Sequence, residues 1–363
     1  MLMVTGLVWH ERFLFHNPTL RYGSRFEPEV HFEHPSTKRR IYTLLMASGL
    51  GDHLQSITAR PATRTELERF HTPEYLDRIE ELSRAGGGVA GEAAPFGPGS
   101  FEVAALAVGG CIEAVEAVVT GRVTNAYALV RPPGHHAERD QGRGFCLLAN
   151  AALAIMSARA VHGVGKVAVI DWDVHHGNGT EQAFYDDPDV LTISIHQDRN
   201  YPIDTGASGD RGSGSGVGAN VNIPLPPGCG LGAYEAVFDR IVEPLVRRHG
   251  PELIVVTSGF DAGAFDPLGA MCLTSNHFGA LARRVVHLAG ELCDGRLLMT
   301  HEGGYSTYEA PFAGLRVLEA MSGHATDWVD PLAGDVDAWP HQPLQPWQAD
   351  LVERYRLEFG LEP

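Results

Sequence analysis

The chain has 363 residues, of which 44% are hydrophobic and 20% are charged, proportions typical of a globular protein that can bury a large core. Its formal net charge of -17 at pH 7 repels polyanions, which argues against a nucleic-acid partner and favours a cationic substrate. The five cysteines are scattered and no pair has the C-x-x-C spacing. This argues against a thiolate metal site or a disulfide framework and favours a reducing compartment.

Residues 1–10 lack the basic start of a signal peptide, so we expect a first strand there. No apolar run approaches the length needed to span a bilayer, and we expect a cytoplasmic protein that does not engage a membrane. Residues 11–35 should form a structured loop, followed by a helix with Ser36 as its N-cap. We expect a flexible loop over residues 85–99. Its one charge, Glu92, we interpret as a solvated side chain, while its position in a loop leaves a substrate contact open as the alternative.

Strands and helices should alternate through the rest of the chain. A long apolar helix is predicted over residues 101–120, packed against a sheet. Apolar runs predict strands over residues 125–130, 166–170, 190–195, 253–258 and 297–300, and periodicity predicts helices over residues 145–161, 233–248 and 275–293. This alternation indicates an α/β protein with a parallel sheet covered by helices on both faces.

The length would allow two domains, but no linker interrupts the alternation between residues 104 and 320. We therefore expect a single domain spanning residues 1–363, with a core that ends near residue 323. Residues 324–363 would form an irregular C-terminal extension with one helix over residues 347–359. We expect this extension to pack on its own domain, while burial against another copy, in a dimer or a tetramer, stays open.

Four predicted loops at the carboxyl ends of strands carry a high density of functional side chains. They are Arg131-Pro132-Pro133-Gly134-His135-His136, Asp171-Trp172-Asp173-Val174-His175-His176-Gly177-Asn178-Gly179, Ser258-Gly259-Phe260-Asp261-Ala262-Gly263 and His301-Glu302-Gly303-Gly304-Tyr305. Ligands bind at this edge of open parallel sheets. Asp171, Asp173 and His175 should project to one side of their strand end, where a divalent cation would offset their burial. A polar loop that caps the next helix is the alternative for that stretch, but the four motifs together favour a metal hydrolase.

The residue types suggest which side chains could hold the metal. Asp173, His175 and Asp261 would offer three nitrogen and oxygen ligands and leave one position open for water, as catalytic zinc requires. Zinc would lower the pKa of that water and polarise a carbonyl group. Tyr305 could then donate a hydrogen bond to the oxyanion that forms on the substrate.

The two adjacent histidines suggest proton transfer. His135 and His136 would act as general base and general acid near the water. An imidazole does this best when an acceptor holds its far nitrogen. Asp171 and Asn178, which flank the expected metal ligands in the sequence, are the candidates for that task.

These motifs resemble those of the zinc-dependent histone deacetylase superfamily over nearly the whole chain, from the first strand to about residue 320. Asn178, where class I members have Asp, is similar to class II members and to bacterial histone deacetylase-like amidohydrolases. The resemblance implies the arginase/deacetylase fold, an eight-stranded parallel sheet with helices on both faces. It also implies hydrolysis of an N-acyl amide, with one zinc ion on Asp173, His175 and Asp261 and with the pairs His135–Asp171 and His136–Asn178.

The resemblance further implies a potassium ion beside the zinc. Its ligands would be the Asp171 side chain, Ser194, Ile195 and the carbonyl groups of Asp173 and His175. The arginase family shares the fold but binds paired manganese ions through a further carboxylate. Gly263 occupies that position here, which favours one metal ion over two.

Members of this superfamily bind acyl-lysine in a channel walled by two aromatic residues. Phe145, after Gly144, matches the first wall, and Tyr201-Pro202 stands where the second wall usually reads Phe-Pro, which adds a hydroxyl group. Leu268 matches the position where a polyamine-specific class II member carries Glu, so its apolar side chain favours acyl-lysine. The glycine pair Gly303 and Gly304 completes the substrate-binding residues that the resemblance implies.

The resulting expectation is a zinc-dependent amidohydrolase that removes acetyl or other acyl groups from lysine side chains in proteins or peptides. The alternative within the enzyme class is hydrolysis of acetylpolyamines or other small N-acyl amines, and the negative charge suits both cationic substrates. A third interpretation is a catalytically silent module that binds acyl-lysine. Tyr305 argues against this because weak class IIa members carry His at that position.

Overall fold

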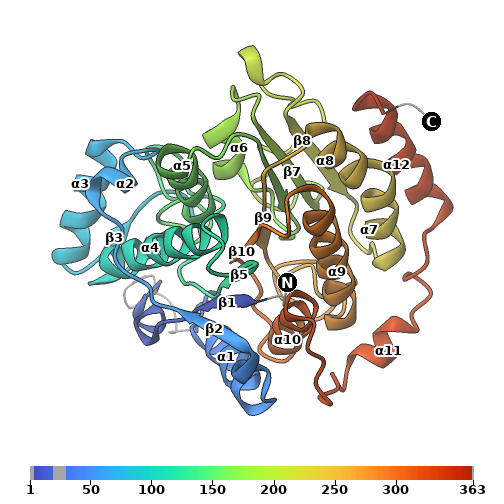
Figure 1. Ribbon diagram of the computed structural model, residues 1–363, viewed down its shortest axis with the longest axis horizontal. Coiled ribbons are helices and arrows are strands. Elements are labelled where there is room, and N and C mark those ends of the chain that lie inside the picture. The colour runs from blue at the N-terminus through green and yellow to red at the C-terminus, as the bar shows by residue number, and fades with distance from the viewer. Residues whose placement is uncertain (1–3, 19–29, 362–363) are drawn as a thin grey trace, which may run out of the picture.

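The computed structural model describes residues 4–18 and 30–361, and its centre is an eight-stranded sheet (Figure 1). The strand order is β2-β1-β5-β10-β9-β6-β7-β8 and every neighbouring pair is parallel, as predicted. The strands are β1 (Thr5–Val8), β2 (Leu54–Ile57), β5 (Asn125–Ala128), β6 (Val167–Asp171), β7 (Val190–Gln197), β8 (Asn220–Leu225), β9 (Leu253–Ser258) and β10 (Leu297–His301). A separate antiparallel pair joins β3 (Gly88–Val89) to β4 (Pro95–Phe96).

Helices cover both faces of the sheet. The α-helices are α1 (Ser36–Ala47), α2 (Arg64–Leu67), α3 (Pro73–Arg84), α4 (Ser100–Val119), α5 (Asn150–His162), α6 (Asn178–Phe184), α7 (Leu231–Val237), α8 (Glu243–His249), α9 (Ser275–Leu292), α10 (Glu309–Ser322), α11 (Ala333–Asp337) and α12 (Pro346–Glu358). Short 3-10 turns are η1 (Glu11–Phe15), η3 (Leu50–His53) and η4 (Gly214–Gly216).

Two hydrophobic clusters lie on the two faces of the sheet. One contains buried side chains of α1, α7 to α10 and α12, and the other contains those of α3, α4 and α5. Strand β6 contributes alternate residues to each, with Ala168 and Ile170 on one side and Val167 and Val169 on the other. This alternation is what a strand buried on both faces requires.

The long apolar helix predicted over residues 101–120 is α4, and it packs against the sheet as expected. Two glycines in its middle permit the close approach. A Cβ atom on Gly109 would lie 1.8 Å from the carbonyl oxygen of Arg60, and one on Gly110 would lie 2.9 Å from Val8 Cγ1 in strand β1. The close packing that these glycines permit therefore outweighs the low helix propensity of glycine.

Several predicted boundaries were wrong. The helix predicted over residues 145–161 starts only at Asn150, and Phe145 has a φ of 68°, which lies outside the helical region. The N-cap of α1 is Pro35, which makes no side-chain cap bond, and Ser36 is the first helical residue. The helix predicted over residues 233–248 is divided by a π-helical turn, η5 (Phe238–Val242).

The loop over residues 85–99 is more ordered than predicted, because it contains the β3–β4 pair. Glu92 is not simply solvated: although its side chain is 58% exposed, its carboxylate lies 2.7 Å from Arg143. Within the earlier loop predicted over residues 11–35, the described part contains η1. Residues 19–29 of that loop and residues 1–3 of the predicted first strand lie outside the described residues.

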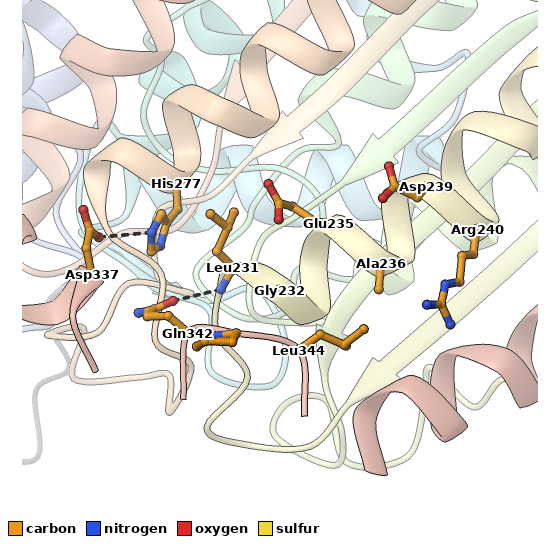
Figure 2. Close-up of a pocket in the computed structure, with 11 residues that line it drawn as sticks. Leu231, Gly232, Glu235, Ala236, Asp239, Arg240, His277, Asp337, Gln342 and Leu344 are labelled. Atoms are coloured by element: carbon orange, nitrogen blue, oxygen red, sulfur yellow. Dashed lines mark hydrogen bonds and ion pairs between the residues drawn. The ribbon is translucent and has the colours of Figure 1, made fainter. Parts of the chain in front are cut away.

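The C-terminal extension packs on its own chain, as expected, and contains α11 in addition to the predicted helix. A hollow of about 440 Å³ lies where the extension meets α7 and α9, and Figure 2 shows the residues that line it. On its rim the His277 ring lies 3.0 Å from Asp337, and Gln342 accepts a hydrogen bond of 2.9 Å from the Leu231 amide. Val352 of α12 and Phe359, the C-cap of that helix, are buried in the core.

Among the described residues, no helix combines the length and apolar character that crossing a membrane would need.

Candidate active site

The four functional loops follow four adjacent strands, β5, β10, β9 and β6. The Arg131–His136 stretch follows β5, the Glu302–Tyr305 stretch follows β10, the Gly259–Gly263 stretch follows β9 and the loop that starts at Trp172 follows β6. Parallel strands end at the same edge of the sheet, so the order of the strands brings all four loops together. The sequence predicted that the loops lie at the carboxyl edge of the sheet, but it did not predict which strands are neighbours.

Asp173, His175 and Asp261 converge on one point, as predicted. Nδ1 of His175 lies 3.0 Å from Asp173 Oδ1 and 3.1 Å from Asp261 Oδ2, and ligand atoms of the three residues all lie within 4.8 Å of one another. Both carboxylates are fully buried. Two buried carboxylates beside one imidazole nitrogen form a set of donors suited to a divalent cation.

The two carboxylates differ in the hydrogen bonds that their oxygens accept. Asp261 Oδ1 accepts a hydrogen bond of 2.8 Å from the Val174 amide. Asp261 Oδ2 lies close to His175 Nδ1 but forms no hydrogen bond with it or with any other described residue. Gly303 donates its amide hydrogen to Asp173 Oδ2 over 2.9 Å, and a Cβ atom on Gly303 would lie 2.0 Å from Asp261 Oδ2. Glycine at this position thus keeps the space beside the carboxylates open. Burial and the Asp173 carboxylate raise the pKa of Asp261 to about 7.

The two histidines lie beside this cluster with different partners. His135 Nδ1 is 3.0 Å from Asp171 Oδ2, His136 Nδ1 is 2.8 Å from Asn178 Oδ1, and the two ring centroids are 4.0 Å apart. These are the two predicted pairs. Burial lowers the pKa of His135, but the carboxylates of Asp173 and Asp171 outweigh it and raise the pKa to about 10.

The environment of His136 lowers its pKa, whereas that of His135 raises it. Burial, followed by the positive potential of His135 and His175, holds the pKa of His136 well below its usual value. Its partner Asn178 carries no charge that could offset this. Neighbouring imidazoles whose pKa values are driven apart can take different roles in a reaction.

Tyr305 is buried, with 9% of its surface exposed, and its pKa is raised by burial and by nearby carboxylates, so its hydroxyl keeps its proton. Asp266, which sequence reasoning did not assign, holds its backbone. Asp266 Oδ2 accepts hydrogen bonds from the amides of Tyr305 (2.6 Å) and Ser306 (3.1 Å), and Oδ1 accepts one from Leu268 (2.9 Å). The loop after β9 and the loop after β10 are therefore fixed to one another.

Glu302 is a second residue whose role the sequence did not reveal. Its buried carboxylate accepts hydrogen bonds from the amides of Gly134 (2.6 Å) and His135 (3.1 Å) and from the Thr300 hydroxyl (2.9 Å). It connects the end of β10 to the histidine loop after β5. In the sequence, the one feature that could have pointed to Glu302 was its position in the Glu-Gly-Gly-Tyr motif.

A buried charge cluster behind the site was also missed. Arg131 donates to Glu33 Oε1 (2.8 Å) and to the carbonyl oxygens of Phe13 (3.1 Å) and His16 (2.7 Å). The Lys38 ammonium lies 3.4 Å from Glu33 Oε1 and 5.5 Å from the centroid of the Tyr305 ring. The arginine of the Arg-Pro-Pro-Gly motif therefore anchors the histidine loop to the segment before α1.

Two aromatic side chains, Phe145 and Tyr201, lie beside the cluster and the histidine pair. The Phe145 ring lies 5.8 Å from the Tyr305 ring, and the Tyr201 ring lies 5.1 Å from His136 and 6.2 Å from His175. Gly144 is needed between them, because a Cβ atom there would lie 2.3 Å from His136 Cδ2. The structure therefore brings Gly144, Phe145 and Tyr201 together.

The remaining predicted residues lie close to these groups. Leu268 is half-buried, and its carbonyl oxygen accepts a hydrogen bond of 2.9 Å from Asn200, in the loop of Tyr201. Gly304 has a φ of 118° just before Tyr305, a conformation that favours glycine. Asp171 lies opposite Ser194 in the β6–β7 register, and Ile195 follows, fully buried.

Comparisons with known proteins agree with this geometry. Residues 31–321 match the histone deacetylase domain. The chain is 47% identical over 352 residues to a histone deacetylase-like amidohydrolase of Pseudomonas aeruginosa, covering 96% of this chain and 93% of that protein. It is 35% identical over 364 residues to the human polyamine deacetylase HDAC10, covering 96% of this chain and 51% of that protein.

A solved structure supports the fold assignment. The crystal structure of the HDA15 HD domain superimposes with a TM-score of 0.85 at 33% sequence identity, covering 98% of this chain and 95% of that one. The parallel sheet and its flanking helices are thus those of the arginase/deacetylase fold. The chain belongs to the histone deacetylase family, and its enzymes are hydrolases that act on amides.

Proposed function

We propose that this protein is a zinc-dependent deacylase that removes acetyl or other acyl groups from lysine side chains of proteins or peptides. The observation that carries the proposal is the convergence of Asp173, His175 and Asp261 beside the histidine pair. Two carboxylates and one imidazole leave a tetrahedral ion one open position, which suits catalytic zinc. The Asp261 oxygen that accepts no hydrogen bond from the described residues supports this fit.

Zinc held by these three residues would supply Lewis acidity, which activates water and polarises the acyl carbonyl group. In place of the division of general base and general acid between His135 and His136 that we expected from the sequence, we propose that His136, whose pKa is lowered, accepts the proton from water and then donates it to the leaving amine. His135, whose pKa is raised by Asp173 and Asp171, would provide positive charge next to the reacting atoms. Tyr305 would donate its hydroxyl hydrogen to the developing oxyanion.

The metal requirement can be tested directly. Treatment with a chelator should abolish hydrolysis of an acetyl-lysine peptide, and addition of one equivalent of Zn²⁺ should restore it. Hydrolysis that continues unchanged after the metal content has fallen to zero would rule out the proposed metal mechanism.

The acyl-lysine channel would be formed by Phe145, Tyr201, Gly303 and Gly304, with Leu268 at its side. An apolar Leu268 offers no counter-ion to the distant ammonium of an acylpolyamine. The second candidate, a polyamine deacetylase, is favoured by the 35% identity to HDAC10. Parallel kcat/KM measurements on an acetyl-lysine peptide and on acetylated putrescine and spermidine decide between them, and a large preference for the polyamines would contradict the first candidate.

A potassium site is also part of the proposal. Asp171, Ser194 and Ile195, with the carbonyl groups of Asp173 and His175, would be its ligands. A small void of about 10 Å³, close to the volume that one water-sized sphere fills, is lined in part by Asp171 and Ser194. Replacing K⁺ in the buffer by tetramethylammonium should change activity or thermal stability, and no change in either would remove potassium from the proposal.

A further inference from the structure

The side-chain amide of Asn178 lies between His136 and Glu138, with its oxygen facing one and its nitrogen facing the other. Its Oδ1 is 2.8 Å from His136 Nδ1, and its Nδ2 donates to Glu138 Oε1 over 2.6 Å. The same nitrogen has a weaker second acceptor, the carbonyl oxygen of His136, at 3.3 Å. Glu138 is only two residues beyond His136, yet it reaches the far end of the amide.

The chemistry of a carboxylate fixes which end of the amide faces Glu138. An ionised carboxylate can only accept hydrogen bonds, so the atom 2.6 Å from Glu138 has to be the nitrogen. A rotated amide would place two oxygens against each other. The oxygen of Asn178 is therefore turned toward His136, and this assignment does not depend on distinguishing nitrogen from oxygen by their positions.

The orientation of the amide determines where His136 carries its proton. An oxygen at Nδ1 can only accept, so the neutral ring has to be protonated on Nδ1 and unprotonated on Nε2. With the amide reversed, Nδ2 would donate to Nδ1 and the ring proton would move to Nε2. A general base needs the first of these two tautomers if Nε2 is the atom that receives the proton.

Glu138 is itself held in place by two donors. Gln141 Nε2 donates to Glu138 Oε2 over 2.6 Å, and Arg143 Nη1 donates to Oε1 over 3.3 Å. Arg143 also contacts Glu92 and Asp204, each at 2.7 Å. The Glu138 side chain is 13% exposed, so water competes only weakly for its oxygens. Aspartate in place of Asn178 would need no such partner, because both of its oxygens accept.

We propose that Glu138 is a positioning residue that sets the tautomer of His136 by orienting the Asn178 amide. This inference rests on the proposed function of His136 as the proton acceptor. The side-chain partners of Glu138 are Asn178, Gln141 and Arg143, and none of the expected metal ligands is among them. Glu138 would therefore act on His136 through Asn178.

The first experiment is a double-mutant cycle in the zinc-loaded enzyme with an acetyl-lysine peptide. Glu138→Met should lower kcat roughly tenfold, as expected for loss of one charge-assisted hydrogen bond, and leave KM nearly unchanged. Glu138→Gln should recover most of this loss, since a glutamine carbonyl can still accept from Asn178. In the Asn178→Asp background, Glu138→Met should cost nothing or raise kcat, because it removes a carboxylate that repels Asp. An equal loss in both backgrounds would overturn the proposal.

The second experiment does not depend on turnover. In ¹⁵N NMR spectra of histidine-labelled protein without added metal, with His136→Ala used to assign the ring, His136 should be protonated on Nδ1. Glu138→Met should shift the ring toward protonation on Nε2, and an unchanged tautomer would overturn the proposal. A tautomer that shifts while kcat stays at the wild-type value would instead contradict the role of His136 as the proton acceptor.

The matched control is Asp204→Asn, which removes another carboxylate from Arg143 at an exposed position, 69% accessible, without touching Asn178. It should leave the His136 tautomer as in the wild type. If Asp204→Asn and Glu138→Met change the tautomer equally, the effect comes from Arg143 and not from the Asn178 amide, and the assignment to Glu138 fails.

Discussion

Tyr305 is the residue whose chemistry can be isolated most cleanly, because a single atom separates it from phenylalanine. Its ring is fixed by Phe145 and by Asp266, which accepts its backbone hydrogen. Tyr305→Phe should therefore keep the fold and the binding of a non-hydrolysable acyl-lysine analogue. We expect kcat to fall by roughly two to three powers of ten, the effect of removing one oxyanion donor. A near-normal kcat would remove the hydroxyl from the mechanism.

His136 allows metal binding and proton transfer to be separated. Its ring is not part of the cluster of ligand atoms formed by Asp173, His175 and Asp261, so we do not expect it to be a ligand of the metal. His136→Ala should abolish most turnover while the zinc content of the purified protein, measured by atomic emission, stays at one per chain. A fall in zinc content would identify His136 as a ligand instead. Asp261→Ala is the comparison that should lose zinc.

The sequence identified residues with reactive side chains better than it identified the residues that position them. Asp173, His175, Asp261 and both histidines lie where the motifs placed them. Glu302 and Asp266 act on backbone amides 168 and 39 positions away. A carboxylate that binds a distant amide leaves no local pattern, so sequence reasoning had no physical signal for either residue.

At the scale of elements, central strands were predicted well and edge strands were not. Leu253–Ser258 is buried at every position and reads as a strand from its apolar run. The edge strands β2 and β8 contain polar residues, and β8 contains Pro224, which an edge tolerates because no further strand needs its amide. Asn220 and Asn222 in β8 donate to Glu181, 39 and 41 positions away, a pairing that local sequence cannot reveal.

The segment before α1 and the loop after β5 are joined by buried charges, which yields a pH-dependent prediction. Burial raises the pKa of Glu33, but Arg131 and Lys38 outweigh it and lower the pKa to about 2. Because the folded pKa lies below the usual value of 4.5, Glu33 contributes stability above pH 4.5. That contribution is lost as the pH falls toward 2.

Glu33→Gln should consequently lower the free energy of unfolding in urea by roughly 3 kcal/mol at pH 7, because it leaves Arg131 and Lys38 buried without a counter-charge. The difference from the wild type should shrink as the pH falls below about 4.5. Glu68→Gln is the control: the Glu68 side chain is 38% exposed, and its i, i+4 pair with Arg64 should contribute less than about 0.5 kcal/mol. A Glu33→Gln effect that is independent of pH would contradict the electrostatic explanation.

For the molecule as a whole, the arrangement of the active site depends on strand order more than on any single loop. The four functional loops are scattered between residues 131 and 305, and they meet because β5, β10, β9 and β6 are neighbours. Alternating strands and helices predict a parallel sheet, and they do not determine which strands are adjacent. The eight-stranded sheet was therefore predicted from the family resemblance, while the residue patterns alone indicated fewer strands.

The net charge of -17 leads to a prediction about substrate capture. A cationic peptide should be drawn to the negative molecule at low ionic strength, and salt should weaken this attraction because the Debye length falls from about 10 Å at 0.1 M to about 3 Å at 1 M. With potassium held constant, adding NaCl over this range should raise KM several-fold for an acetyl-lysine peptide flanked by arginines. For the same peptide flanked by glutamates KM should stay constant or fall, and kcat should change equally for both. Parallel changes in KM for the two peptides would show that the charge of the molecule does not guide binding.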